Sequence, residues 1–286
     1  MPSLKAIRKR ISSVNSTQQI TKAMKMVAAA KLRRAQTAAV AARPYAERLE
    51  VMVGHLLHRL PDDAHPLLRI PEQTTRTYAI VVTGDRGLCG GYNTNLNRMT
   101  EGFLRDAGAD VRLAVVGRKG LEHLRRRRIA VAEQAPMPTA PAAVDLAHKL
   151  GTVAQELFIT DAVDRVMLIY TQFHSALSQV PVVEQLLPFP RNELDADAPA
   201  IDYLFEPGPA EILGHLLPRR LEVRILHALL EAGASEQAAR MTAMDSATRN
   251  ASEMIARLTL EMNRARQAAI TKELMEIISG AEALKG

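Results

Sequence analysis

Apolar residues in the first sixty positions recur at alternating steps of four and three. With this spacing a helix presents one continuous seam to a partner helix. Pro44 lies inside the segment, where we expect it to kink the helix or loosen one turn. We therefore predict one long helix over residues 3–60. Its seam positions are Ile7, Ile11, Val14, Gln18, Thr21, Lys25, Ala28, Leu32, Ala35, Ala39, Ala42, Ala46, Leu49, Val53, Leu56 and Leu60, with polar residues at Gln18, Thr21 and Lys25.

A second helical pattern fills the end of the chain. Between Leu221 and Leu284 there is no proline, and a helix over that stretch would span about 96 Å. Such a helix needs a partner face to be stable, and the N-terminal helix offers one. We predict an antiparallel pair forming one shaft. The heptad positions are Ile255, Leu258, Met262, Ala265 and Ala269, continued one position over by Ile270, Leu274, Ile277, Ala281 and Leu284.

The middle of the chain has a different pattern. Short β-branched runs at 78–82, 111–116, 129–132 and 165–170 predict strands, and 94–106 and 142–158 predict helices. Strands that alternate with helices are typical of a mostly parallel sheet with helices on its faces. The run Val180–Leu187 is expected to form a hairpin with the strand that ends near Thr171, and 188–209 to be loop.

These patterns divide the chain into three parts. We expect an N-terminal coiled-coil helix at 1–60, an α/β base domain at 61–207 and a C-terminal coiled-coil helix at 208–286. The predicted fold class is α/β, with a long antiparallel coiled coil of the two terminal helices and an inserted domain holding the mostly parallel sheet.

Composition agrees with a helical shaft. Aromatic residues make up only 3% and there is no Trp, although sheet cores and ligand pockets lean on aromatics. The single cysteine, Cys89, provides neither a disulfide nor a cysteine-based metal site within the chain. No apolar run reaches the length of a membrane span.

Charge is unevenly distributed. Residues 1–60 contain 12 Lys and Arg but 2 Asp and Glu, and the first acidic residue is Glu47. The basic band formed by Lys22, Lys25, Lys31, Arg33 and Arg34 has three readings: a solvated face, a nucleic-acid patch, or a surface that faces an acidic protein. An acid-free leader also resembles a mitochondrial transit peptide, but the unbroken seam argues against cleavage.

Several local motifs allow a chemical reading beside a structural one. Gly84–Gly91 follows a strand like a phosphate loop, yet Tyr92 and Asn93 stand where Lys and Ser or Thr would be needed. A structural turn is the alternative. His55 and His58 share a helix face without a third metal ligand. The run Arg125–Arg128 is either a solvated helix end or a contact to an acidic partner.

Four motifs in order identify a family. Ile20–Met24 followed by Met26–Ala29, Asp85–Gly91 followed by Tyr92 and Asn93, Ser235–Met241, and above all Ala265–Ala281 resemble the γ subunits of F-type ATP synthases, the central-stalk rotor. The plastid-type cysteine pair is absent and no transit segment precedes the first helix, which favours a bacterial type.

The resemblance implies a rotor that turns inside a hexamer of alternating α and β subunits and has no catalytic site, cofactor or metal of its own. It implies further partners in the ε subunit and the membrane c-ring, and a peripheral place on the cytoplasmic face of the bacterial inner membrane. The implied rotor–stator contacts are Lys22, Met24, Arg266, Gln267, Thr271 and Glu273. An apolar tip (Ile277, Ile278, Ala281 and Leu284) would turn in a hydrophobic sleeve, and Tyr203 and Glu206 would face the membrane ring.

Two rival functions remain at the level of sequence. A nucleotide-using α/β enzyme would need a phosphate loop, and the Gly84–Gly91 turn lacks the lysine of such a loop. A basic coiled-coil protein that binds DNA or membrane surfaces would show salt-steep DNA binding, but it leaves the C-terminal motif without an explanation.

Overall fold

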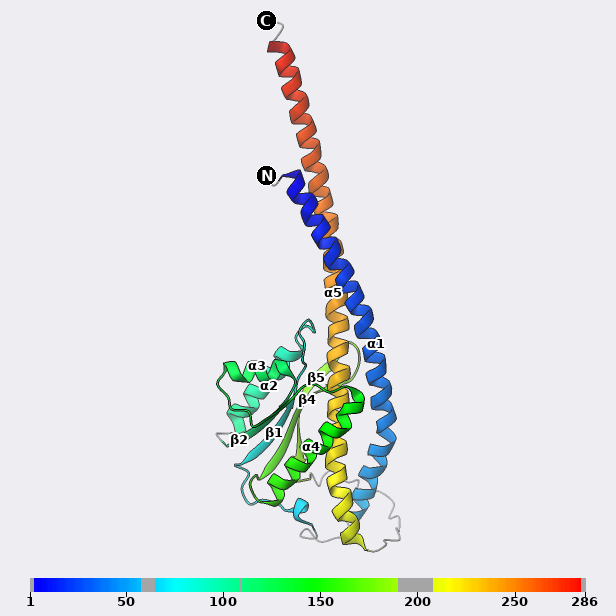
Figure 1. Cartoon of the computed structure of the whole chain (residues 1–286), viewed down its shortest axis with the longest axis vertical. Coiled ribbons are helices and arrows are strands. Elements are labelled where there is room, and N and C mark those ends of the chain that lie inside the picture. Colours follow the sequence, from blue (N-terminus) through cyan, green and yellow to red (C-terminus); the bar gives the residue numbers. More distant parts are fainter. Residues whose placement is uncertain (1–2, 58–64, 108–109, 190–207, 284–286) are drawn as a thin grey trace. The chain divides into compact units, whose positions relative to one another are not determined.

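A computed structural model describes residues 3–57, 65–107, 110–189 and 208–283. The chain divides into two compact units, and the first and last helices contribute to both. The sheet unit comprises residues 28–240, and the helix-pair unit comprises residues 1–27 and 241–286. The two long helices are α1 (Leu4–Leu57) and α5 (Pro209–Ala283), drawn in blue and in yellow to red in Figure 1. The three-part division expected from the sequence stays a prediction.

The sheet has five strands in the order β3-β2-β1-β4-β5. Its members are β1 (Thr77–Val82), β2 (Val111–Val116), β3 (Glu133–Ala135), β4 (Arg165–Phe173) and β5 (Gln179–Leu187). All neighbours are parallel except β4 and β5, which form the predicted antiparallel hairpin. Every residue of β1 is buried, as expected of a central parallel strand covered on both faces. The prediction of a mostly parallel sheet is confirmed.

Helices cover both faces of this sheet (Figure 1). Helices α2 (Tyr92–Ala107) and α3 (Arg118–Arg126) pack on the face to which β1 contributes Ala79 and Val81. Helix α4 (Ala140–Ile159) and α5 pack on the opposite face, to which β1 contributes Tyr78, Ile80 and Val82. The side-chain alternation of a strand thus divides the interior into two cores.

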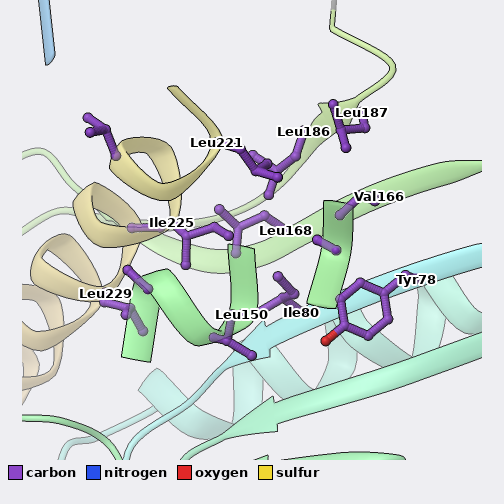
Figure 2. Close-up of a cluster of buried hydrophobic side chains, with 14 of the residues drawn as sticks. Tyr78, Ile80, Leu150, Val166, Leu168, Leu186, Leu187, Leu221, Ile225 and Leu229 are labelled. Atoms are coloured by element: carbon purple, nitrogen blue, oxygen red, sulfur yellow. The ribbon is translucent and has the colours of Figure 1, made fainter. Parts of the chain in front are cut away.

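The larger core lies between the sheet and helices α4 and α5 (Figure 2). Side chains from the strands meet side chains from α4 and a row from α5 at helical spacing. The residues labelled in Figure 2 are Tyr78, Ile80, Val166, Leu168, Leu186 and Leu187 from the strands, Leu150 from α4, and Leu221, Ile225 and Leu229 from α5. Helix α5 is therefore an integral part of the sheet unit's core.

Helix α1 joins the same core through Leu49, Val53 and Leu56. Within the sheet unit, α1 runs towards the end of the unit at which α5 begins (Figure 1), and Glu50 of α1 binds Arg220 of α5. The two helices therefore run antiparallel here. A short 3-10 turn, Pro66–Leu68, adds two buried leucines to the core beside α4.

The seam predicted for α1 is confirmed by burial. Every seam position from Ile7 to Leu56 is buried or half-buried, including the polar ones. Leu60 lies outside the described residues. The helix continues on both sides of Pro44, which stands at an exposed position between the seam residues Ala42 and Ala46.

One predicted strand requires correction. The strand predicted at 129–132 is wrong, because α3 ends in a turn with Arg128 at φ 58° and the strand begins at Glu133. Ile129 and Val131 are apolar because they pack against the smaller core. Helix α5 extends beyond the proline-free stretch that begins at Leu221: it starts at Pro209 and contains Pro218. Leu213, Leu217 and Leu221 are each at most 1% exposed, and this burial offsets the cost of a proline within the helix. Of the predicted loop, 190–207 lies outside the described residues.

Candidate functional site

The helix-pair unit holds three polar pairs in its seam. They occupy successive layers and run in opposite order along the two helices, so the pairing is antiparallel. The hydrogen bonds run from Gln18 Nε2 to Ser252 Oγ (2.6 Å), from Thr248 Oγ1 to Thr21 Oγ1 (2.8 Å) and from Lys25 Nζ to Asp245 Oδ1 (2.5 Å). The polar residues that looked like weak seam positions are therefore paired across the seam.

These pairs contribute more to register than to stability. The side chains of Lys25 and Asp245 are 44% and 34% exposed, and such a pair adds less than about 1 kcal/mol. The hydrogen bond from Lys25 nevertheless lowers the pKa of Asp245. Polar residues at seam positions disfavour alternative registers, because a shift would leave them opposite apolar side chains.

The seam of α5 continues towards the C-terminus and then stops. Leu258 is buried, and Ile255, Met262, Ala265 and Ala269 are half-buried, as the heptad predicts. From residue 270 to residue 280 every side chain is exposed. Counting from the Gln18–Ser252 pair, the start of α1 at Leu4 lies opposite residue 266, so α1 covers no more of α5 among the described residues. The apolar series at Ile270, Leu274 and Ile277 was predicted to continue the seam, but these side chains are exposed.

The residues implied as rotor–stator contacts lie on the surface of this unit. Arg266, Gln267, Thr271 and Glu273 are exposed on the last turns of α5. Lys22 is exposed and Met24 half-buried on α1. Ile277 and Ile278 of the implied apolar tip are 72% and 48% exposed. The remaining implied contacts, Tyr203, Glu206, Leu284 and the side chain of Ala281, fall outside the described residues.

The basic band lies mostly on the surface. Lys22, Lys31, Arg33 and Arg34 are exposed, and Lys25 is the member that turns into the seam. Because Lys25 pairs with Asp245 across the seam, it does not belong to the exposed basic surface. The exposed members therefore provide a positive surface on α1, as each of the three readings of the band requires.

The Gly84–Gly91 segment forms the turn between β1 and α2, and it packs on α5. A Cβ atom at Gly84 would stand 2.9 Å from the carboxyl group of Glu236. The Gly87 carbonyl accepts a hydrogen bond from Arg240 at 3.4 Å, and the Tyr92 hydroxyl donates to the Ala232 carbonyl at 3.2 Å. These contacts support the structural reading of the turn, in which glycine permits close approach of a neighbouring helix.

A buried ion pair of α5 lies at the junction where the Gly84–Gly91 turn packs on this helix. Arg240 donates to Glu236 at 2.5 Å, and both side chains are at most 10% exposed. Burial raises the pKa of the Cys89 thiol and of the Tyr92 hydroxyl beside it, so Cys89 stays a neutral thiol that accepts from Asn93 Nδ2 at 3.2 Å. Two of the four motifs, Asp85–Gly91 and Ser235–Met241, thus meet in one packed junction.

Comparison with known proteins identifies the family. The family model described as ATP synthase matches residues 3–284. The "ATP synthase gamma chain" of Anaeromyxobacter sp. (strain Fw109-5) is 50% identical over 291 aligned residues, covering 100% of both chains. That of Moorella thermoacetica is 49% identical, again over 100% of both chains.

The chain belongs to the ATP synthase gamma chain family. It is accordingly a subunit of an ATP synthase complex.

Solved structures agree with this gamma-chain assignment. A chain of the Tetrahymena thermophila mitochondrial ATP synthase central stalk and c-ring is 26% identical, with a TM-score of 0.58, over 80% of this chain and 99% of that one. A chain of the Euglena gracilis mitochondrial ATP synthase rotor shares the fold at a TM-score of 0.64 and 22% identity, over 93% and 98%. No helix in the described part of this gamma chain combines the length and apolarity that crossing a membrane requires.

Two sequence motifs of this gamma chain remain, the arginine run and the histidine pair. The Arg125–Arg128 run is the exposed end of α3, where Arg125 donates to Gln134 and Arg127 pairs with Glu101. His58 lies outside the described residues, and within the described ranges no three His, Cys, Asp or Glu side chains gather as metal ligands would.

Sequence reasoning missed a contact that holds the two gamma-chain helices together. Arg220, 4% exposed on α5, binds Glu50 of α1, and its guanidinium lies 4.5 Å from the ring centroid of Phe189. The partners are 170 positions apart along the chain. No local pattern indicates such a pair, because Arg220 stands among other charged residues in the sequence, beside Arg219 and Glu222.

Proposed function

We propose that the chain is the central rotor shaft of an F-type ATP synthase. It turns inside a hexamer of alternating α and β subunits and couples ion flow through the membrane sector to ATP synthesis or hydrolysis. The observation that carries the proposal is full-length identity of about half with proteins named ATP synthase gamma chain. The paired long helices and the rotor structures that share the fold support it.

The shaft acts by presenting different faces to its surroundings. A partner shifts the equilibrium of a binding site only through contacts that differ between the states of that site. The pair of α1 and α5 is asymmetric: one helix carries Lys22 and Met24, and the other carries Arg266, Gln267, Thr271 and Glu273. As the shaft turns, each β subunit meets these faces in succession, and its site is biased between open and closed states.

The chain has no catalytic site of its own in this proposal and holds no cofactor. The complex it serves translocates protons. Its partners are the α and β subunits, the ε subunit and the c-ring, which Tyr203 and Glu206 face. The exposed basic residues of α1 meet acidic protein segments rather than nucleic acid. The place of the chain is peripheral, on the cytoplasmic face of the bacterial inner membrane.

Copurification tests this proposal. The tagged chain is recovered from its native membranes, washed with salt, and the eluate is assayed for ATPase activity. The expected result is a large complex with two ~50 kDa subunits at about 3:3:1 to this chain, with ATPase activity. Recovery of the chain alone, or with nucleic acid, would contradict it and favour the basic coiled-coil alternative.

A further inference from the structure

The sheet unit buries a carboxyl group that none of the contacts above uses. The side chain of Glu231, on α5, is 11% exposed. Its Oε2 atom has no hydrogen-bond partner among the described residues. One turn earlier, His227 places Nε2 3.8 Å from Oε1 of Glu231, which is too far for a hydrogen bond. An ionised carboxylate buried in this way is costly unless it is paired.

The charged groups around Glu231 are mostly engaged with one another. Arg224 of α5 donates through Nε to Glu184 of β5 at 2.9 Å, and the Tyr170 hydroxyl of β4 donates to the other oxygen of Glu184 at 3.3 Å. The charge of Arg43 on α1 also lowers the pKa of Glu231, but the Arg43 side chain is exposed and its charge is screened by water. Among the described residues, therefore, no arginine or lysine forms a hydrogen bond or ion pair with Glu231 that would neutralise its charge.

Glu231 also connects α5 to the end of β4. The backbone of Phe173, the last residue of β4, interacts with the carboxyl group of Glu231 and lowers its pKa. The next residues turn the chain into β5, with the His174 amide donating to the Ser178 carbonyl at 3.3 Å. The protonation state of Glu231 thus acts on the contact between α5 and the root of the β4–β5 turn.

We propose that Glu231 is a proton-binding site that makes the packing of α5 against the β4–β5 hairpin depend on pH. Burial raises the pKa of Glu231 from 4.5 to about 7, and the neighbouring Glu184 acts in the same direction. Hydrogen bonding by Phe173 and the charges of Arg43 and Arg224 oppose that rise. Burial lowers the pKa of His227, so the histidine is neutral near pH 7 and does not compensate the carboxylate.

The direction of the pH effect follows from linkage. The folded state holds the Glu231 proton up to about pH 7, whereas the unfolded chain releases it near pH 4.5. Stability from this group is complete below pH 4.5 and is lost as pH rises to 7. The measurement is the folding equilibrium constant of the full chain and of Glu231→Gln between pH 5 and 8.5, by urea unfolding. The ratio of wild type to variant should fall about tenfold per pH unit between pH 5 and 7 and then level off.

Controls separate Glu231 from its neighbours. Glu253→Gln, which removes an exposed carboxyl group from the same helix, should keep the wild-type pH dependence. A ratio of wild type to Glu231→Gln that stays flat over the range would overturn the proposal. So would a pH dependence that survives in Glu231→Gln and disappears in His227→Gln. If Glu231→Gln does not fold, the wild-type carboxyl carbon resonance decides: titration near pH 7 supports the proposal, and titration near 4.5 refutes it.

Discussion

Asp164 shows how one buried carboxylate can organise the end of a sheet. It accepts hydrogen bonds from the backbone amides of Thr75 (3.0 Å) and Arg76 (2.8 Å) and from the Arg76 guanidinium (2.6 Å). Its side chain is 5% exposed. The Arg76 guanidinium holds the pKa of Asp164 well below its usual range. These bonds fix the chain as it enters β1 and β4.

Replacing Asp164 by Asn should destabilise the fold by about 2–3 kcal/mol at pH 7, because hydrogen bonds to a charged group are lost. A depressed pKa contributes stability that is present above the unfolded value of 3.8 and is lost as pH falls below it. Urea unfolding at pH 7 and pH 3 should therefore show a large difference between wild type and variant at pH 7 and a smaller one at pH 3. Asp161→Asn is the control, since that side chain is 61% exposed. Equal effects at both pH values would contradict the account.

Met24 tests the proposed rotor surface at a single position. A lysine in its place adds a charge that binds acidic segments of the β subunits and impairs coupling between hydrolysis and pumping. We expect Met24→Lys to keep ATPase activity while ATP-driven proton pumping falls, as measured by quenching of a pH-sensitive dye in membrane vesicles. Met24→Leu, which stays apolar, should pump normally. Unaltered pumping by Met24→Lys would count against Met24 as a contact.

At the scale of elements, the connection from β2 to α3 depends on one glycine. Gly117 has φ 95°, and a Cβ atom there would stand 2.1 Å from the Thr83 carbonyl oxygen. Its amide donates to the Ala135 carbonyl at 2.8 Å, so the same residue also joins β3. The end of the sheet therefore tolerates no side chain at this position.

Gly117→Ala should destabilise the chain by about 3 kcal/mol or more, since it adds both backbone strain and a clash. The matched control is Gly102→Ala in α2, where an added Cβ meets nothing within 4 Å. That substitution should stabilise by up to about 1 kcal/mol through helix propensity. Thermal unfolding of both variants measures the contrast, and a Gly117→Ala protein as stable as wild type would refute this reading of the turn.

The elements differ in how well the sequence predicts them. The α1 seam follows a local period, so each described position from Ile7 to Leu56 could be assigned from spacing alone. β3 could not, because Ile129 and Val131 are apolar through core packing while Glu133, which is polar, forms the ladder with Ala114. Neither the partner of Arg220 nor the burial of the Glu231 carboxyl group could be predicted, because both depend on residues that are distant in the sequence. Exposure of the implied contacts is visible in the structure, but their roles stay predictions.

At the scale of the whole molecule, the central claim is that this chain rotates. Its two units carry different parts of that proposal. The helix-pair unit offers the exposed end of α5 and the exposed Lys22 of α1. The sheet unit contains segments of both long helices. They pack into its larger core, part of which is drawn in Figure 2, and the Arg220–Glu50 pair joins them. A shaft must transmit torque without its helices sliding, and the paired polar layers and the Arg220–Glu50 pair supply contacts between the helices that resist sliding.

Direct observation of rotation tests this claim most directly. Leu177 is 85% exposed in the β4–β5 turn, and Cys89 is buried, so Leu177→Cys provides one reactive thiol for a probe. The chain is assembled with its α and β subunits, the hexamer is fixed to a surface, and the probe is followed after ATP is added. The account predicts stepwise rotation in one direction that requires ATP. A hexamer that hydrolyses ATP while the probe on this chain stays still would contradict it.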